Sequence, residues 1–484
     1  MISDVVGTSA YCAFGGWVMI FAGLLRWRFT ESMDDKSNNH GLYQWSSNFY
    51  RKGGALMDFW NALPHIVNLT ATATVYLGVY LAEATSNPYW TFLTFFVGFG
   101  AVPIGDLLIG EDSYNPSPSE ETQMRANNWF RFHTLTYVWS YVASVVYFAS
   151  YMQNVKVNSV AFWGISTSLG ISSGFGIGCI HELIHRPTFL EMNHGRLVLL
   201  FSNYNHFWVE HLWGHHKRVA TEEDPASSAL NEPLWTFIWK CLYLSFVDAC
   251  NLEEKFQRGR GRGFWTPYNR IVVPFLVSFA IDYAFYHYFG LAALCFQLVQ
   301  SFLTAFLTDN ANYIEHYGLR RKRLSEKKDE WGLYRDYEPQ SWMHSWNTGD
   351  RVSNWMLFKI ERHPDHHVNA GRPYQILRTY KESPTYPTGY AGMFVLSWFP
   401  PLWFMVMNPI ARKAGIDYGN QLKDGSYKTI FPSGANNISS VYKKTGEGHY
   451  EAGSQMAQDI DINEGKGGSV WEGDGVGVHG AKQD

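Results

Sequence analysis

Several long apolar stretches constrain the fold of this 484-residue chain more than any other feature of its sequence. A helix needs roughly 18 or more mostly apolar residues to cross the hydrocarbon core of a bilayer. Only 17% of the residues are charged, compared with about 25% in typical soluble domains. The sequence therefore predicts an all-α integral membrane protein with candidate spans at residues 8–25, 56–82, 89–109, 133–152, 159–184, 271–289 and 291–314.

The first candidate span is predicted to be an extra N-terminal helix beside six core spans. A signal peptide is the alternative, but no small-residue cleavage site follows, and Arg26 and Arg28 come next. Basic residues orient the other spans, because cytoplasmic loops carry an excess of Lys and Arg. The loops near 83–88 and 286–290 contain neither residue. The cytoplasmic segments are then 26–55, 110–132, 185–270 and everything after about 315.

Charge and cysteine content argue against nucleic-acid binding and against any structural or metal-binding role of the cysteines. The formal net charge is −4 and no basic stripe with interleaved aromatic residues is present, which argues against a nucleic-acid-binding protein. The five cysteines are scattered and form no C-x-x-C motif. Neither a disulfide framework nor a thiolate metal site is therefore indicated.

Histidines supply the chemistry that the cysteines do not. Residues i and i+4 share a helix face, so His181 and His185 can bind one metal ion. His211 and His215 repeat this geometry, and His216 is expected to point aside, towards a second ion. Nine clustered imidazoles exceed the roughly four to six positions of a single ion, so two metal ions are implied. The predicted metal-binding and catalytic histidines form four clusters in the sequence: His181, His185, His211, His215, His216, His316, His363, His366 and His367.

A carboxylate accompanies each histidine cluster. Neutral imidazoles leave the charge of two divalent cations uncompensated, and metal-bound histidines usually donate their second N–H to an acceptor. We therefore expect some of the neighbouring carboxylates to support the ligands: Glu182, Glu210, Glu315, Glu361 and Asp365.

Ligand type alone does not identify the metal, because imidazole suits zinc, copper, iron and nickel. His181–His185 also matches H-E-x-x-H, the signature of zinc metalloproteases, with Glu182 as the general base. That function would leave three clusters unexplained. A metal transporter is a further alternative, but transporters place their ligands near the bilayer midplane.

His206 and His344 stay undecided, and the isolated histidines are interpreted as structural: His40, His65, His133, His194, His287, His449 and His479.

The order and spacing of the four clusters resemble those of the membrane-bound alkane monooxygenases, within the histidine-box hydroxylase and desaturase superfamily. The resemblance covers roughly residues 50–410. It extends to segments outside the clusters, namely Gly100–Asp106, Gly110–Asp112, Asn115–Pro116, Val219–Thr221, Asp224–Ala226, Asn251–Glu254, Asn312–Leu319, His344–Asn347, Val352–Asn354 and Pro387–Tyr390. The chain has Asp350 where the family often has histidine, and residues 1–40 have no counterpart in shorter members.

The resemblance implies six transmembrane helices under a cytoplasmic cap, and a pair of iron ions held by the nine histidines. It implies that one oxygen atom from O2 enters a terminal methyl C–H bond of an alkane, giving a primary alcohol and water. Electrons would come from NAD(P)H through a rubredoxin reductase and a separate rubredoxin, since no paired C-x-x-C motif is present. Basic residues near 255–262 could attract an acidic donor. A fatty-acyl desaturase or an aromatic side-chain hydroxylase is the closest alternative.

These observations divide the chain into an N-terminal extension (1–40), a catalytic domain of membrane helices and cap (41–410) and a Gly-rich tail expected to be disordered (411–484). Within the catalytic domain, family comparison places a bulky residue at the position of Trp60, beside the alkyl chain. An interfacial or packing role for Trp60 is equally compatible with the sequence. The expected substrate channel is formed by Trp60, Leu63, Pro64 and Val67.

Overall fold

The structure is a computed structural model that describes residues 59, 61–329, 332–380 and 382–424, together with two short strands, β1 (Tyr442–Lys444) and β2 (Tyr450–Ala452), which pair antiparallel. The predicted span at 8–25, Trp60 and most of the predicted tail lie outside the described residues. The division into three domains therefore stays a prediction.

Helices make up nearly all of the regular structure in the described residues, as the sequence predicts. The elements before the first histidine cluster are η1 (Leu63–Ile66), α4 (Val67–Thr85), η2 (Pro88–Phe92), α5 (Leu93–Phe96), η3 (Val97–Ala101), α6 (Val102–Ile109), α7 (Pro118–Ala126), α8 (Asn128–Tyr151), η4 (Met152–Asn154) and α9 (Val160–Phe175). The middle elements are α10 (Ile177–Ile184), α11 (Phe189–Phe201), α12 (Phe207–Val209), η5 (Glu210–His215), α13 (His216–Arg218), α14 (Leu234–Gly259), α15 (Val272–Phe289) and α16 (Leu291–His316). The cap adds η6 (Trp342–His344), α17 (Arg351–Met356), α18 (His363–Val368), η7 (Tyr374–Ile376), α19 (Tyr390–Ser397) and α20 (Pro400–Asp424).

Several of these helices are long and apolar enough to cross a membrane. Four helical stretches qualify among the described residues, namely Leu63–Thr85, Pro88–Ile109, α15 and α16, and the pair α9–α10, bent by 42°, makes a fifth. The 24-residue helix α8 covers the predicted span at 133–152 except its last residue, but it does not qualify, because its tyrosines, serines and other polar residues lower its mean hydropathy. A multi-pass membrane protein is supported, and the sixth core span stays a prediction.

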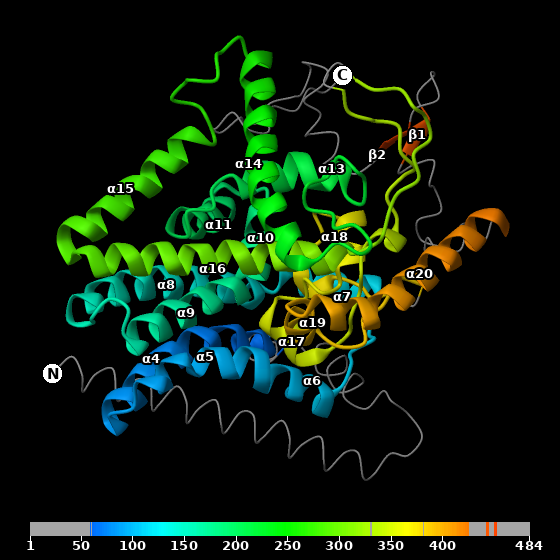
Figure 1. Ribbon diagram of the computed structural model, residues 1–484. Helices are drawn as coiled ribbons and strands as arrows, with labels where there is room; N and C mark the ends of the chain where they lie inside the picture. The colour runs from blue at the N-terminus through cyan, green and yellow to red at the C-terminus, as the bar shows by residue number, and fades with distance from the viewer. Residues whose placement is uncertain are drawn as a thin grey trace, which may run out of the picture.

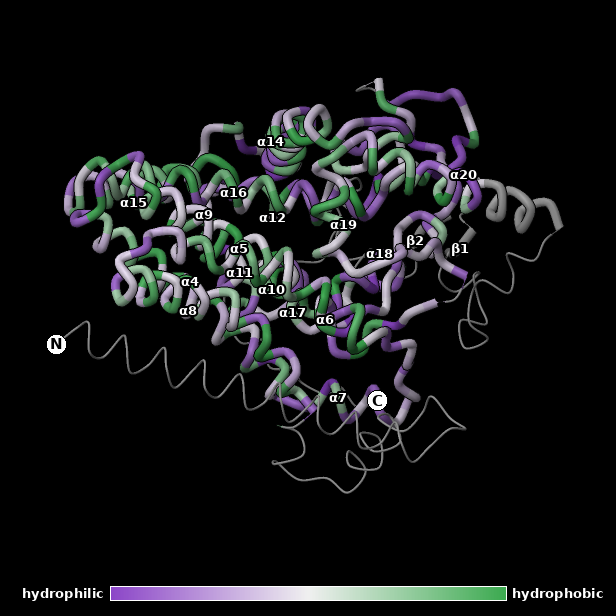
Figure 2. The backbone as a smooth tube through the Cα atoms, turned by 60° about the horizontal axis from the view of Figure 1, so that its bottom comes forward, coloured by the Kyte–Doolittle hydropathy of each residue, from purple (hydrophilic) through white to green (hydrophobic). Residues whose placement is uncertain are grey.

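The spans lie side by side, and α14 stands across them at a steep angle (Figure 1). Hydrophobic stretches run along α5, α9 and α16, whereas the region around α18 and α20 carries longer hydrophilic stretches (Figure 2). Sharp turns join the antiparallel spans. Ser86 ends α4 in the left-handed conformation at φ 54°, and Gly290 joins α15 to α16 at φ 85°, a conformation that glycine adopts without steric cost.

Glycines allow the helices that carry the histidines to pack closely. Gly170 and Gly174 of α9 face Leu303 and Leu307 of α16, and a Cβ on Gly170 would lie 2.6 Å from the Leu303 Cβ. Small residues of this kind let helix backbones approach each other within a membrane. The chain then bends at Gly176, and α10 continues towards the cap. The close contact of α9 with α16 brings the ends of α10 and α16 to the same region of the molecule.

The cap is fixed to the helices by a buried arginine. Arg362, whose side chain is 1% exposed, donates to the carbonyls of Tyr114 (2.9 Å), Leu377 (2.7 Å) and Asp112 (2.9 Å), and pairs with the Asp112 carboxylate at 3.0 Å. These bonds join the loop after α6 to the segment after η7. Because Arg362 immediately precedes α18, they also fix the position of the last histidine cluster.

Candidate metal centre

The nine predicted histidines converge on one buried region and form two groups, within each of which the candidate ligand atoms lie within 4.8 Å of one another. Group one consists of His181, His185, His211, His216 and His366, and group two consists of His215, His316, His363 and His367. The prediction of two sites able to hold metal ions is therefore supported by the geometry of the side chains.

The spacing of the ring nitrogens fits a central cation in each group. In group one, the Nε2 atoms of His185, His211 and His216 are mutually 3.1 Å apart. A neutral imidazole carries one hydrogen on its two nitrogens, so three Nε2 atoms facing each other cannot all be satisfied by mutual hydrogen bonds. Metal–nitrogen bonds of about 2.0–2.1 Å would place neighbouring ligands about 3 Å apart. An ion at the centre would therefore accept all three lone pairs.

Group two has the same character. The Nε2 atom of His367 lies 2.8 Å from that of His363 and 3.2 Å from that of His215, and the His363 and His316 Nε2 atoms are 3.3 Å apart. Each of these side chains is nearly inaccessible to solvent. The Nε2 atoms thus face a common centre in each group, which leaves the Nδ1 atoms free to bond to other parts of the protein.

Burial keeps the imidazoles in the form that binds metals. Desolvation, followed by the proximity of the other imidazoles, lowers the pKa of His211, His216, His363, His366 and His367 well below the usual 6.5. The rings are therefore neutral at physiological pH, and a neutral ring offers a lone pair to a metal ion.

A widened helical turn separates two neighbouring ligands. We predicted that His211 and His215 share one ion and that His216 turns away, and this assignment of partners is wrong. Residues Glu210–His215 form a π-helical turn, in which the backbone N–H of His216 bonds to the carbonyl of His211. The wider turn sets His216 beside His211 and directs His215 to group two. By contrast, His181 and His185 lie at the end of the regular helix α10 and share group one as predicted.

The clearest acceptor for a ligand imidazole is a carboxylate that our prediction missed. Oδ2 of Asp224 lies 2.9 Å from Nδ1 of His215, and the side chains are fully buried. The carboxylate also accepts from Ser227 Oγ at 2.5 Å and from the Ala226 N–H at 3.1 Å. His215 is thus oriented with Nε2 towards group two. The match of Asp224–Ala226 to the family was the one signal in the sequence that could have identified this residue.

Of the predicted carboxylates, only Glu315 has a described contact with a ligand histidine, with Oε2 3.4 Å from Nε2 of His363. Glu182 pairs with Arg186 and accepts from the Tyr374 N–H, and Glu361 accepts from Ser353, Asn354 and the Tyr390 N–H. Asp365 accepts from the Tyr380 hydroxyl and from two N–H groups, and one oxygen of Glu210 has no partner among the described residues. These carboxylates mainly hold the segments that carry the ligands.

The undecided histidines belong to neither group within the described part of the chain. The carbonyl oxygen of His344 lies 3.1 Å from Nδ1 of His316, so its backbone orients a ligand of group two. His206 is buried and stacks on Phe275. His65 is buried against Phe358 and Tyr374, which fits its interpretation as structural.

Leu63, Pro64 and Val67 are half-buried in η1 and at the start of α4. Their role beside a substrate stays a prediction. The zinc protease alternative fits poorly, because His181 and His185 share group one with three further imidazoles. Catalytic zinc sites typically have three protein ligands. In addition, Glu182, which would be the general base of a protease, forms an ion pair with Arg186.

Comparison with known proteins is consistent with this geometry. Residues 158–397, which contain all nine histidines, match the fatty acid desaturase family model. The chain is 34% identical to alkane 1-monooxygenase 1 of Alcanivorax borkumensis over 70% of its own length and 82% of that protein. It is 37% identical to alkane 1-monooxygenase 2 of Pseudomonas aeruginosa over 69% and 88% of the two chains. The hydroxylase component of the Pseudomonas putida xylene/toluene monooxygenase is 26% identical over 47% and 58%.

Proposed function

Because the chain belongs to the alkane 1-monooxygenase family, we propose that it inserts one oxygen atom from O2 into a terminal C–H bond of an alkane to give a primary alcohol. The observation that carries the proposal is the pair of buried imidazole groups at the ends of apolar spans. An alkane dissolves in the bilayer, whereas electrons and protons come from water. A site at helix ends lies where both can reach it.

We assign an iron ion to each imidazole group, with five ligands in group one and four in group two. Bound iron would supply the redox chemistry that activates dioxygen. The protein's own contribution is orientation and charge. Asp224 fixes the ring of His215, the His344 carbonyl lies against His316, and the carboxylates of Asp224 and Glu315 offset part of the cationic charge.

We further propose that the site faces the cytoplasm and that a separate rubredoxin, reduced by an NAD(P)H-dependent reductase, supplies the electrons. The basic residues at the C-terminal end of α14 offer one docking surface for an acidic donor. Arg258 is 67% exposed at the end of α14 and pairs with Glu254 at 2.5 Å, and the guanidinium groups of Arg260 and Arg262, which follow it, lie over Phe256 and Tyr268. Such steering would weaken strongly with salt.

Feeding the substrates of the rival functions to cells that express the protein tests the proposal. Octane, hexadecane, xylene and an acyl thioester would be supplied separately, with cells carrying a His181→Ala variant as the control. We expect primary alcohols from the alkanes. Benzylic alcohol alone would favour the xylene/toluene relative, and an alkene would favour desaturation. Metal analysis of the purified protein should find about two iron atoms per chain, whereas zinc alone would refute the mechanism.

A further inference from the structure

A charged hairpin of the cap contacts residues that support the ligands of group two. This cap hairpin consists of residues 321–329 and 332–338, and it follows α16 as an extended yellow-green segment in Figure 1. Its arms run antiparallel, and the N–H of Leu324 donates to the Asp336 carbonyl at 2.8 Å. In its described part, no residue belongs to either imidazole group. Any effect of the hairpin on bound metal must therefore pass through the residues that it contacts.

One arm of the cap hairpin holds the residue next to Asp224. Glu223 is half-buried, and it accepts the backbone N–H of Tyr334 at 3.2 Å and the hydroxyl of Tyr337. Both donors come from the second arm of the hairpin. Because Glu223 and Asp224 are adjacent in the chain, these bonds restrict the backbone that presents the Asp224 carboxylate to His215.

The base of the cap hairpin holds the same loop at a strained position. Ala220 adopts a φ of 57°, a conformation that costs free energy for a residue other than glycine and persists only where neighbouring contacts hold it. Its carbonyl accepts the backbone N–H of Arg321 at 2.7 Å, and its own N–H donates to Ser227 Oγ at 2.8 Å. The side chain of Arg321 also donates to the Lys217 carbonyl at 3.2 Å. The turn that leads to Asp224 is therefore held by the hairpin.

The end of the cap hairpin contacts a second support of group two. Oε1 of Glu338 accepts the backbone N–H of Lys322 at 2.6 Å and lies 3.5 Å from Nε2 of His344. Glu338 and His344 are both buried. The carbonyl oxygen of His344 in turn lies 3.1 Å from Nδ1 of His316. The hairpin thus reaches two of the four ligands of group two, each through one intervening residue.

Most charged pairs on a surface hairpin contribute little to stability, and the pair of Arg323 with Glu222, whose side chain is 65% exposed, belongs to that class. Glu223 and Glu338 differ from it, because each contacts or adjoins a residue that orients a ligand Nδ1. We propose that the cap hairpin positions these two supports and so strengthens metal binding in group two, with Glu223 and Glu338 as the positioning residues. The inference rests on the proposed function, because it takes the imidazole groups as metal sites.

Removing one hydroxyl group tests the proposal with little change in volume. Tyr337→Phe keeps the ring and deletes the donor to Glu223. Parent and variant proteins would be loaded with iron and titrated with an Fe(II) chelator. We expect Tyr337→Phe to release iron at a chelator concentration roughly three- to tenfold lower, a smaller effect than that of a residue bonded directly to a ligand. Arg335→Gln is the control, because it breaks the pair with Asp329 at 2.7 Å in the same hairpin, and it should retain iron as the parent does.

A double-mutant cycle separates positioning from a general loss of stability. If the hydroxyl of Tyr337 acts through Asp224, Tyr337→Phe should have little further effect on iron release in an Asp224→Ala background. Fully additive effects of the two substitutions would overturn the proposal, as would parent-like iron release in folded Tyr337→Phe. The melting temperature of each variant without iron would be measured alongside, because a purely structural role would change that value and leave the effects on iron release additive.

Hydrogen exchange of the unaltered protein gives an answer that does not depend on a variant folding. Coupling between two sites is reciprocal, so removal of iron should loosen the cap hairpin. Amides of residues 332–338 should exchange faster after chelator treatment than before it, with α15, which contributes no residue to either group, as the internal reference. Equal exchange of the hairpin in both states would overturn the proposal. Failure of the parent protein to bind any metal would instead refute the proposed function.

Discussion

Replacing Asp224 by alanine should weaken binding of the proposed iron ions, because it removes the only side-chain carboxylate that lies within hydrogen-bond distance of the Nδ1 atom of one of the nine clustered histidines in the described residues. In the variant, the Nδ1–H of His215 would face a dry space, since both side chains are fully buried. Loss of a hydrogen bond to a charged partner costs about 1.5–3 kcal/mol. At about 1.4 kcal/mol per factor of ten, this corresponds to roughly a ten- to hundredfold weaker affinity, which agrees with the usual effect of such supporting residues.

Competition with an Fe(II) chelator measures this effect directly. The parent and variant proteins would be loaded with iron and titrated with chelator, and the iron per chain would be followed at each step. Asp224→Ala should release its iron at a chelator concentration ten- to hundredfold lower. Asp224→Asn should fall between the two, because its amide oxygen can still accept from His215 but carries no charge.

Glu253→Gln is the matched control for loss of a buried carboxylate. Glu253 is fully buried, pairs with Arg270 at 2.6 Å and contacts neither imidazole group. This variant should lower the melting temperature without changing the release of iron. Parent-like iron retention in folded Asp224→Ala, or equal iron loss in Glu253→Gln, would refute the argument that Asp224 acts by orienting His215.

Three further variants test other parts of the description. His316→Ala should abolish alcohol formation, because it removes one of the four imidazoles of group two; full activity would exclude His316 from the ligands. Trp60→Ser should lengthen the alkane that is accepted, and an unchanged chain-length profile in whole-cell assays would count against that role. Gly178→Ala should lower the free energy of unfolding by about 1–3 kcal/mol, because its Cβ would collide with the Leu357 carbonyl. Gly100→Ala, which meets open space, is its control, and equal melting temperatures for the two variants would contradict the packing argument.

The sequence predicted which histidines would gather, but not how they would divide. His181 and His185 follow the simple rule for residues four apart because α10 is a regular helix up to that point. His211, His215 and His216 break the rule, since a π turn cannot be recognised from spacing alone. The assignment of partners therefore depended on a local backbone feature.

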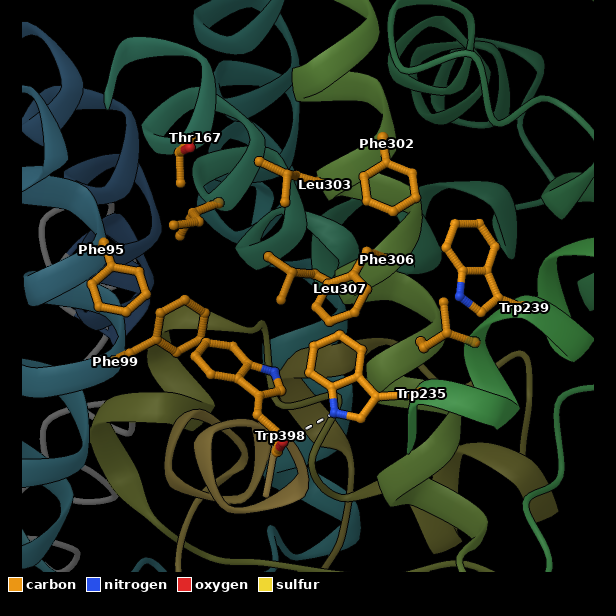
Figure 3. A pocket seen from close by; sticks show the side chains of 12 residues that line it. Phe95, Phe99, Thr167, Trp235, Trp239, Phe302, Leu303, Phe306, Leu307 and Trp398 are labelled. Atoms are coloured by element: carbon orange, nitrogen blue, oxygen red, sulfur yellow. Dashed lines mark hydrogen bonds between the residues drawn. The ribbon is translucent and has the colours of Figure 1, made fainter. Parts of the chain in front are cut away.

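Long-range contacts explain why the supporting residues were harder to predict. Asp224 reaches His215 through a loop in which Ala220 adopts a φ of 57°. A loop that folds back in this way leaves no periodic pattern in the sequence. Glu361 and Asp365 stand beside ligands in the sequence, yet their hydrogen bonds go to α17 and to the segment after η7. An apolar cavity beside Trp398 is lined by side chains from five separate parts of the chain (Figure 3). Only the fold brings these parts together.

The two imidazole groups share their backbone. His215 and His216 are adjacent in the chain, as are His366 and His367, and each pair gives one ring to each group. An ion in one group therefore immobilises two segments that the other group also requires, which lowers the entropic cost of binding the second ion. By reciprocity, departure of either ion loosens the other. Loading should thus be cooperative, and the protein with only one of the two groups filled should be a minor species.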